Sequence, residues 1–583
     1  MRIQSLLLAA AFLMRAAVAA DLSLETVAEK SKFLRTGHYD EVQRLCAAYA
    51  ATWPDNVRCS EFGRTPEGRP MLAIVASRTG SLTPEDARQR GIPVMLVQGG
   101  IHAGEIDGKD AGFLALREQL QNKDALRFHV LVFVPVFNVD GHERFGRWNR
   151  PNQVGPEEMG WRATAQNLNL NRDYMKADAP EMQAMLRLLN SWDPTLYVDL
   201  HVTDGAQFQH DVSNTIEPFY TGAALLHPAA KSLVQELNKR IAAQGSKPLD
   251  FYPDFVKEDD PASGFAITAY SPRFSTGYWA LHNRLTLLVE THSWKDYATR
   301  VRVTHNILVA LSDMITREGD RWRAQEHEAD IRARQIGGQT VALNYGTGEH
   351  VTQIDFLGYA YTREKSDISG ALATRYDATK PQVWHVPLRD EAVTSLSVQA
   401  PRRGYIVPAA YAGWMAEKLT LHGVQFEKLV IGMPRAEVEA FRATKVTYSK
   451  EPFEGHAMVT LDGAWAVERR PIPPGSLYVP IAQANSRVAL ALLEPRAVDS
   501  LAAWGFFNTA FEPKEYMEPY VEEQVAADML AHDPKIAAEF KQRLTDPAFA
   551  ASPQARLDFF YRHHPSWDER LNLYPIYRVA FEP

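Results

Sequence analysis

The sequence predicts an α/β fold with a mixed, mostly parallel sheet flanked by helices over roughly the first 335 residues, followed by a C-terminal α+β region. Three observations lead to this prediction. Short apolar runs typical of buried strands alternate with amphipathic runs of helical period. A charge-rich run from 317 to 334 ends at Gly337-Gly338. Beyond it, strand patterns recur without that alternation. We therefore expect one α/β domain at 21–336 and an accessory α+β region at 340–583.

The predicted elements of the first domain follow from these patterns in chain order. A turn signal at 65–70 separates two extended runs and predicts a hairpin. The predicted strands are Val57–Phe62, Met71–Ser77, Val94–Gln98, His129–Pro135, Thr195–Leu200 and Leu285–Val289. The predicted helices are Ala111–Leu120, Glu181–Leu189, Pro228–Ala243 and Arg302–Ile315, with a solvated helix at 317–334.

The C-terminal region shows shorter patterns and no internal repeat. Strands are expected at Thr340–Leu343, Gln382–Pro387, Ser395–Ala400, Met458–Leu461 and Ser476–Pro480. Helices are expected at Tyr411–His422 and Tyr520–His532. No residue pattern here points to a particular chemistry, so its role is left open between capping the cleft, supporting the catalytic domain and binding substrate.

The N-terminus has the features of a secretory signal peptide in residues 1–20. Arg2 precedes the apolar run Leu6–Met14, and small residues Ala17–Ala20 follow. The alternative is an uncleaved amphipathic helix. We expect export to a periplasm or the cell exterior. No later run is long enough for a membrane span, so no stable membrane insertion is expected. The net charge of -8 argues against nucleic acid as a partner.

Only two cysteines are present, Cys46 and Cys59. In an oxidising compartment they could form a disulfide, and two free buried thiols are an equal alternative, because sequence does not give their separation. Two cysteines exclude a zinc site built of four thiolates.

A metal site is predicted from three residues at the ends of strands. His102 and Glu105 lie on the turn after the strand that begins at Val94, and His201 ends the strand from Thr195. Open α/β sheets bind ligands at the carboxyl ends of their strands. Two imidazoles and one carboxylate leave a fourth position open, as in catalytic zinc sites. The alternative for each single histidine is a hydrogen-bonded structural role.

A candidate general base ends another apolar strand. Glu290 follows Leu285–Val289 directly. Burial of a carboxylate there costs free energy unless the carboxylate is solvated, is paired with a cation or has a functional role. A general base beside an activated water is such a use.

The segment between the second and third ligands is basic and rich in amides. It contains Trp161-Arg162 and Asn171-Arg172. Arginine presents a planar fork that binds a carboxylate bidentately, and asparagine can donate beside it. The alternative is that these are surface arginines in a loop.

Together these residues resemble the zinc carboxypeptidase family typified by carboxypeptidase A, the M14 metallopeptidases. The resemblance rests on His102-x-x-Glu105, Trp161-Arg162, Asn171-Arg172, His201 and Glu290, in that order, and on a turn at Asn138-Val139-Asp140-Gly141. It covers roughly residues 25–335.

The resemblance implies a role for each residue. His102, Glu105 and His201 would bind one Zn²⁺. Glu290 would act as the general base, and Arg162 would stabilise the oxyanion. Asn171 and Arg172 would bind the free C-terminal carboxylate of a peptide. A mobile tyrosine upstream of the base is also expected, with Tyr270 the nearest candidate and Tyr278 the next.

The sequence departs from the family pattern at several positions. Gly104 stands where pancreatic members carry an arginine, and Asn169 where an aspartate commonly supports the first zinc histidine. The side-chain pocket is expected within Pro272–Tyr278, where Arg273 would either favour an acidic substrate group or pair internally with an aspartate.

The function predicted from this pattern is that of an exported zinc metallopeptidase that removes C-terminal residues from peptides by attack of a zinc-activated water. One alternative is a zinc-dependent amidase or deacylase acting on N-acyl amino acids or cell-wall peptides. A second is a zinc-containing binding protein without turnover, against which Glu290 argues.

Overall fold

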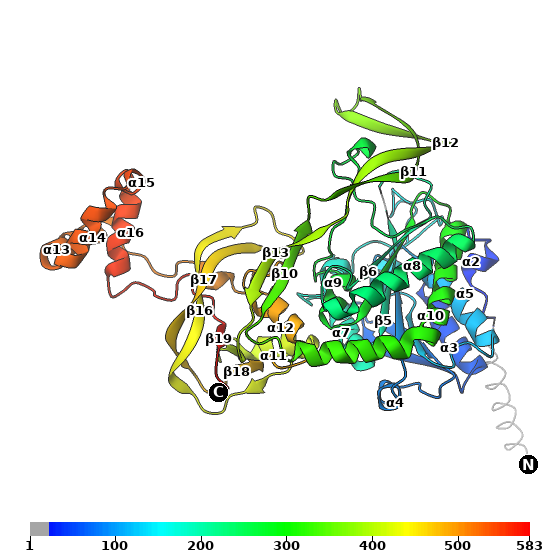
Figure 1. The fold of residues 1–583 in the computed structure, drawn as a ribbon, viewed down its shortest axis with the longest axis horizontal. Helices are drawn as coiled ribbons and strands as arrows, with labels where there is room; N and C mark the ends of the chain where they lie inside the picture. The colour runs from blue at the N-terminus through cyan, green and yellow to red at the C-terminus, as the bar shows by residue number, and fades with distance from the viewer. Residues whose placement is uncertain (1–22, 204) are drawn as a thin grey trace, which may run out of the picture.

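An eight-stranded mixed sheet forms the centre of the first part of the chain (Figure 1). We describe it from a computed structural model, which describes residues 23–203 and 205–583; the predicted signal peptide lies outside these residues. The strand order is β1 (Val57–Arg64), β2 (Pro70–Ala76), β4 (Val130–Val134), β3 (Val94–Gly99), β5 (Leu196–Thr203), β9 (Leu285–His292), β6 (Val212–Glu217) and β7 (Pro248–Leu249).

The four central strands of this sheet run parallel and are buried along their whole length. β4, β3, β5 and β9 pair in parallel, whereas β2 joins β4 and β6 joins β9 in the antiparallel direction. Every residue of these four strands is buried. Both faces of the sheet are therefore covered, as the unbroken apolar runs require. The predicted fold class is confirmed, as is the hairpin of β1 and β2.

Helices connect these strands and cover the sheet. They are α2 (Val27–Lys30), α3 (Tyr39–Thr52), α4 (Pro84–Arg90), α5 (Asp107–Gln121), α6 (Val139–Glu143), α7 (Pro180–Trp192), α8 (His227–Ala243), α9 (Ser275–Leu281) and α10 (Tyr297–Ala333). The prediction of two helices at 302–315 and 317–334 was wrong, because α10 is one continuous helix of 37 residues. No glycine or proline breaks it at the expected junction, and Gly319, Trp322 and Ala329 stay buried within its charged half.

The C-terminal region adds three further sheets. β10 (Thr340–Thr347) pairs with β13 (Ala392–Gln399). β11 (Val351–Lys365) and β12 (Leu372–Arg389) form a long hairpin that projects from the body in Figure 1 and that pairs with β8 (Phe265–Ala266). The third sheet contains β14 (Gly404–Val407), β15 (Glu427–Lys428), β16 (Met433–Tyr448), β17 (Val459–Ile472), β18 (Leu477–Pro480) and β19 (Tyr577–Val579).

Two groups of helices belong to this region. α11 (Ala412–Leu421) and α12 (Ser486–Leu493) pack against the body, whereas α13 (Pro519–His532), α14 (Pro534–Arg543), α15 (Pro547–Ala550) and α16 (Pro553–His563) stand apart from it (Figure 1). The separate group has its own aromatic core, which includes Phe540, Phe549 and Phe559. The rest of the region shares a continuous apolar core with the first 336 residues, to which Val341, Leu490 and Tyr574 contribute.

A disulfide joins Cys46 on α3 to Cys59 on β1, with 5.4 Å between the two Cα atoms. Of the two alternatives that the sequence left open, a disulfide and two free thiols, the structure contains the disulfide. Disulfides persist mainly in oxidising compartments.

None of the described helices is long and apolar enough to cross a membrane.

Candidate metal centre and substrate cleft

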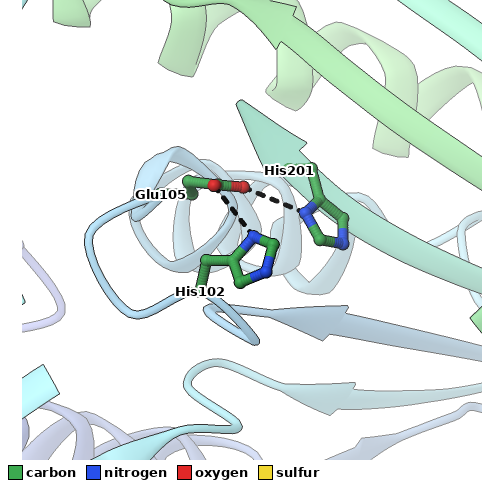
Figure 2. A group of neighbouring side chains, drawn as sticks. All are labelled: His102, Glu105 and His201. Carbon is green, nitrogen blue, oxygen red and sulfur yellow. Dashed lines mark hydrogen bonds and ion pairs between the residues drawn. The ribbon is translucent and has the colours of Figure 1, made fainter. Parts of the chain in front are cut away.

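Three predicted ligands meet at the carboxyl edge of the sheet (Figure 2). His102 and Glu105 lie on the tight turn after β3, where the Glu105 N–H donates to the carbonyl of His102 at 2.9 Å. His201 lies near the end of β5. Each histidine places its Nδ1 at 2.9 Å from a different carboxylate oxygen of Glu105. The possible ligand atoms of the three residues all lie within 4.8 Å of one another, and all three residues are buried.

The far ring nitrogen of each histidine faces a side-chain oxygen. The Nε2 of His102 lies 3.2 Å from Oδ1 of Asn169, at the position where the family pattern has an aspartate. The Nε2 of His201 lies 3.0 Å from Oδ2 of Asp199. A partner at Nε2 fixes the ring and leaves Nδ1 free to bind a metal. The donor set and its supports therefore fit a zinc ion.

The sequence analysis missed Asp199. Its carboxylate also accepts hydrogen bonds from Gln98 at 2.9 Å and Ser275 at 2.6 Å, so its position is fixed. A signal was present, because residues two apart on a strand point to the same face, and Asp199 precedes His201 by two. The chain thus places a carboxylate behind its second histidine and an amide behind its first.

Positive charge surrounds Glu105. Arg150 approaches its Oε1 at 3.0 Å and Arg162 at 3.5 Å, while the Val202 N–H donates to Oε2 at 3.1 Å. Burial by itself raises the pKa of the Glu105 carboxyl, but its interactions with His102 and with the charge of Arg150 hold that pKa well below its ordinary value. Glu105 therefore presents an ionised carboxylate to the centre.

The two histidines differ in their electrostatic surroundings. Burial lowers the pKa of His102 to about 4, so its imidazole is neutral at pH 7. Burial also acts to lower the pKa of His201, but the carboxylates of Asp199 and Glu290 raise it well above its ordinary value. A cation that replaces this proton would meet the same negative surroundings.

Arg150 occupies the space that Gly104 leaves open. A Cβ at position 104 would lie 2.7 Å from Cγ of Arg150 and 2.6 Å from the carbonyl of Gly160. The arginine that pancreatic members carry at this position is therefore replaced in space by one from a loop 46 residues downstream. Sequence analysis missed Arg150, because nothing in its surrounding residues marks it.

Arg162, Asn171 and Arg172 lie in the same cleft as the three ligands. The Asn138 side chain, from the predicted turn, donates to the carbonyl of Arg162 at 3.1 Å and so holds that segment. Arg172 donates to the carbonyl of Asn171 at 2.7 Å and lies 4.5 Å above the ring of Phe274.

Within the described part of the chain, no carboxylate forms an ion pair with Arg172. Burial lowers the pKa of Arg172, and the neighbouring Arg162 and Arg273 lower it further. An arginine nevertheless stays charged in a protein. The guanidinium of Arg172 thus has the shape to bind a carboxylate, and it forms no ion pair with a carboxylate of the described residues.

The cleft is a cavity of about 730 Å³ with Glu290 in its wall. Glu290 on β9 stands opposite His201 on β5 in the parallel register and opposite Ser213 on β6 in the antiparallel one. Its carboxylate therefore lies at the same edge as the metal ligands, with Tyr270 lining the same cavity. This volume suits a small ligand or the end of a peptide.

Two predicted substrate residues lie elsewhere. Arg273 binds Asp499, with its Nε at 2.7 Å and its backbone N–H at 2.9 Å from the two carboxylate oxygens. This is the internal pairing that the sequence left as an alternative. Tyr278 is buried inside α9, and its hydroxyl lies 2.9 Å from Nδ1 of His422. Neither side chain lines the cavity, although Pro272, Phe274 and residues 275–277 of the same stretch do.

Residues 42–264 match the family model described as zinc carboxypeptidase. This match spans 223 of the 583 residues, and over this part the chain is similar to zinc carboxypeptidases, which are hydrolases of peptide bonds. Carboxypeptidase 2 of Trichophyton rubrum is 23% identical over 473 residues, covering 76% of this chain and 79% of that protein. Carboxypeptidase 2 of Trichophyton equinum is 21% identical, with the same coverage.

These sequence alignments cover more of the chain than residues 21–336 contain, so the similarity continues into the C-terminal region. Among solved structures, carboxypeptidase A from Helicoverpa armigera has 16% identity and a TM-score of 0.34, covering 56% of this chain and 81% of its own.

Proposed function

We propose that this protein is an exported zinc carboxypeptidase that removes single residues from the C-terminus of peptides. The observation that supports this most is the positive charge of Arg172 in the cleft. Arg172 stands without a carboxylate partner among the described residues, beside Asn171 and in one cavity with the metal triad and Glu290. A free C-terminal carboxylate matches the bidentate fork of arginine.

His102, Glu105 and His201 would hold the zinc ion. When bound, zinc would polarise the scissile carbonyl. It would also lower the pKa of the water bound to it, so that this water can be deprotonated at neutral pH. The residues of the chain bind and orient the substrate. Asn171 and Arg172 bind the terminal carboxylate and so place the last peptide bond beside the metal triad. Because that clamp needs a free carboxylate, only the terminal bond is presented for cleavage.

Glu290 would act as general base and then as general acid. Its carboxylate takes a proton from the attacking water and delivers it to the leaving amine. Arg162, within 3.5 Å of Glu105, is positioned to stabilise the negative charge that develops on the carbonyl oxygen. Tyr270 lines the cavity and is the candidate tyrosine near the base.

Export is supported by the signal-peptide pattern of residues 1–20 and by the Cys46–Cys59 disulfide.

Replacement of Glu290 by glutamine tests the enzymatic assignment. The side chain keeps its size but loses the ability to accept a proton. We expect turnover of a free peptide to fall by at least about 100-fold while zinc content, measured by elemental analysis, stays at the wild-type level. Unchanged turnover in Glu290→Gln would exclude this glutamate as the base. No turnover in the zinc-loaded wild type on any peptide would favour the binding-protein alternative.

A further inference from the structure

Arg487 is a half-buried cation in the wall of the substrate cavity, far in sequence from the predicted site. It lies in the first turn of α12, whose other residues are all buried. Its Nε is fully buried and has no hydrogen-bond partner. Within residues 23–203 and 205–583, no carboxylate or carbonyl binds its guanidinium. A buried donor nitrogen is nearly always hydrogen-bonded, because leaving it without an acceptor is costly.

The position of Arg487 is fixed by contacts with the catalytic part of the chain. The Ser486 hydroxyl donates to the carbonyl of Ala333 at the end of α10, at 2.8 Å. The Asn283 side chain, two residues before β9, donates to the carbonyl of Ala484 at 3.2 Å. The helix also packs on α9, which forms part of the cavity wall. The backbone that carries Arg487 is therefore anchored to the first part of the chain beside the cavity.

Arg487 and Arg172 line this cavity from different elements. Arg172 belongs to the 3-10 helix Leu170–Arg172 and lies over the ring of Phe274, whereas Arg487 projects from α12. A ligand whose carboxylate is held by Arg172 thus leaves Arg487 available for a second anionic group.

We propose that Arg487 binds the acidic side chain of a C-terminal glutamate or aspartate and so sets the substrate preference of the enzyme. This inference rests on the proposed function. With the terminal α-carboxylate on Arg172 and Asn171, the side chain of the last residue remains to enter the rest of the cavity. Among the described residues that line it, Arg487 is then a cation without a hydrogen-bonded partner, and it is supplied by the C-terminal region, which gives that region a part in substrate recognition.

An acidic residue in the same cavity makes the opposite preference conceivable. Glu217 lines the cavity, and a carboxylate there could attract a basic side chain. Its Oε2, however, already accepts the backbone N–H groups of Phe219, Tyr220 and Thr221 at 2.6, 3.1 and 3.1 Å. Burial also raises the pKa of Glu217, so its ionised form is disfavoured. Its acceptor is occupied, whereas the donors of Arg487 are not.

The test is a set of peptides that differ only in their last residue: glutamate, glutamine, leucine or lysine. For zinc-loaded wild type, we expect kcat/KM to be about 10- to 100-fold higher for glutamate than for glutamine, as for a hydrogen bond to a charged group. Glutamine is the matched substrate, because it differs from glutamate in charge and hardly in shape. Equal rates for both, or a preference for lysine, would overturn the inference and would direct attention to Glu217.

Two variants locate the preference. Arg487→Gln should bring the ratio of glutamate to glutamine close to one. Arg435→Gln, an exposed arginine on β16, is the control and should keep the wild-type ratio. A wild-type ratio in Arg487→Gln would also overturn the inference.

Should Arg487→Gln fail to fold, Arg487→Lys keeps the charge and loses the fork, and its ratio should fall between those of wild type and one. If none of the peptides is cleaved by wild type, the proposed function fails rather than this inference.

Discussion

The carboxylate of Glu454 accepts the backbone N–H of Asn169 at 2.9 Å. Glu454 belongs to the turn between β16 and β17 in the C-terminal region, whereas Asn169 faces the ring of His102. Asn169 Oδ1 also accepts the N–H of Asn171 at 3.0 Å. One residue thus joins the metal triad, the carboxylate clamp and the C-terminal region.

Further contacts reinforce this junction. His456 from the same turn lies 2.7 Å from Asp178, and Lys418 on α11 lies 3.3 Å from it. These contacts lie just beyond the clamp segment that carries Arg172. The C-terminal region therefore supports the site from the outside, in addition to the wall that it contributes at Arg487.

Removal of the Glu454 side chain should loosen the clamp. In Glu454→Ala, the N–H of Asn169 loses its acceptor. We expect KM for free peptides to rise about 2- to 10-fold, as for one hydrogen bond, with a smaller change in kcat. Glu451→Ala, in the same turn and exposed, serves as the control. Equal KM values in both variants would mean that Glu454 does not position the clamp.

Asp199 should control zinc affinity. In Asp199→Asn, the carboxylate behind His201 becomes an amide, like the one already present behind His102. Loss of such a support typically weakens metal binding by about 10- to 100-fold. Competition with a chromophoric chelator measures the zinc Kd, while far-ultraviolet circular dichroism reports that the fold is kept. Ser275→Ala, which removes one donor to Asp199, should show a smaller effect. An unchanged Kd in Asp199→Asn would contradict this role.

Stability should fall in mild acid because of His422. This fully buried histidine faces the hydroxyl of Tyr278, and burial lowers its pKa to about 3. Its stabilising contribution is complete above the unfolded pKa of about 6.5 and is lost as the pH falls towards 3, because only the unfolded chain then binds the proton. At pH 5 the loss from this one group is about 2 kcal/mol.

Urea unfolding at pH 7 and pH 5 measures this loss. The free energy of unfolding of His422→Gln should drop less between the two pH values than that of wild type, by about 2 kcal/mol. Equal pH dependence in the two proteins would show that His422 is protonated in the folded state or contacts solvent there.

Local patterns were sufficient to predict the sheet and the metal triad. Apolar runs long enough for buried strands ended at His102, His201 and Glu290, and parallel strands bring their carboxyl ends to one edge. Element ends and the long exposed hairpins were less predictable. β12, for example, carries polar residues on both faces, so the alternation that marks a half-buried strand is missing over most of its length.

The parts of the site that sequence did not indicate depend on contacts between distant segments. Arg487 lines the cleft and Glu454 contacts Asn169, although both lie about 250 to 385 residues from His102, Glu105 and His201 along the chain. No periodicity links such positions. Tyr278 illustrates the converse, because a residue in an apparently suitable stretch was turned into the core by a helix of only seven residues.

The most direct test of the account is hydrolysis of matched peptides with free and amidated C-termini by the zinc-loaded protein, followed by mass spectrometry. Clamping of a terminal carboxylate by Arg172 predicts stepwise loss of single C-terminal residues from the free peptides, with the amidated peptides left intact. Arg172→Ala should remove this difference by abolishing most of the cleavage. Cleavage of free and amidated peptides at similar rates would contradict the account.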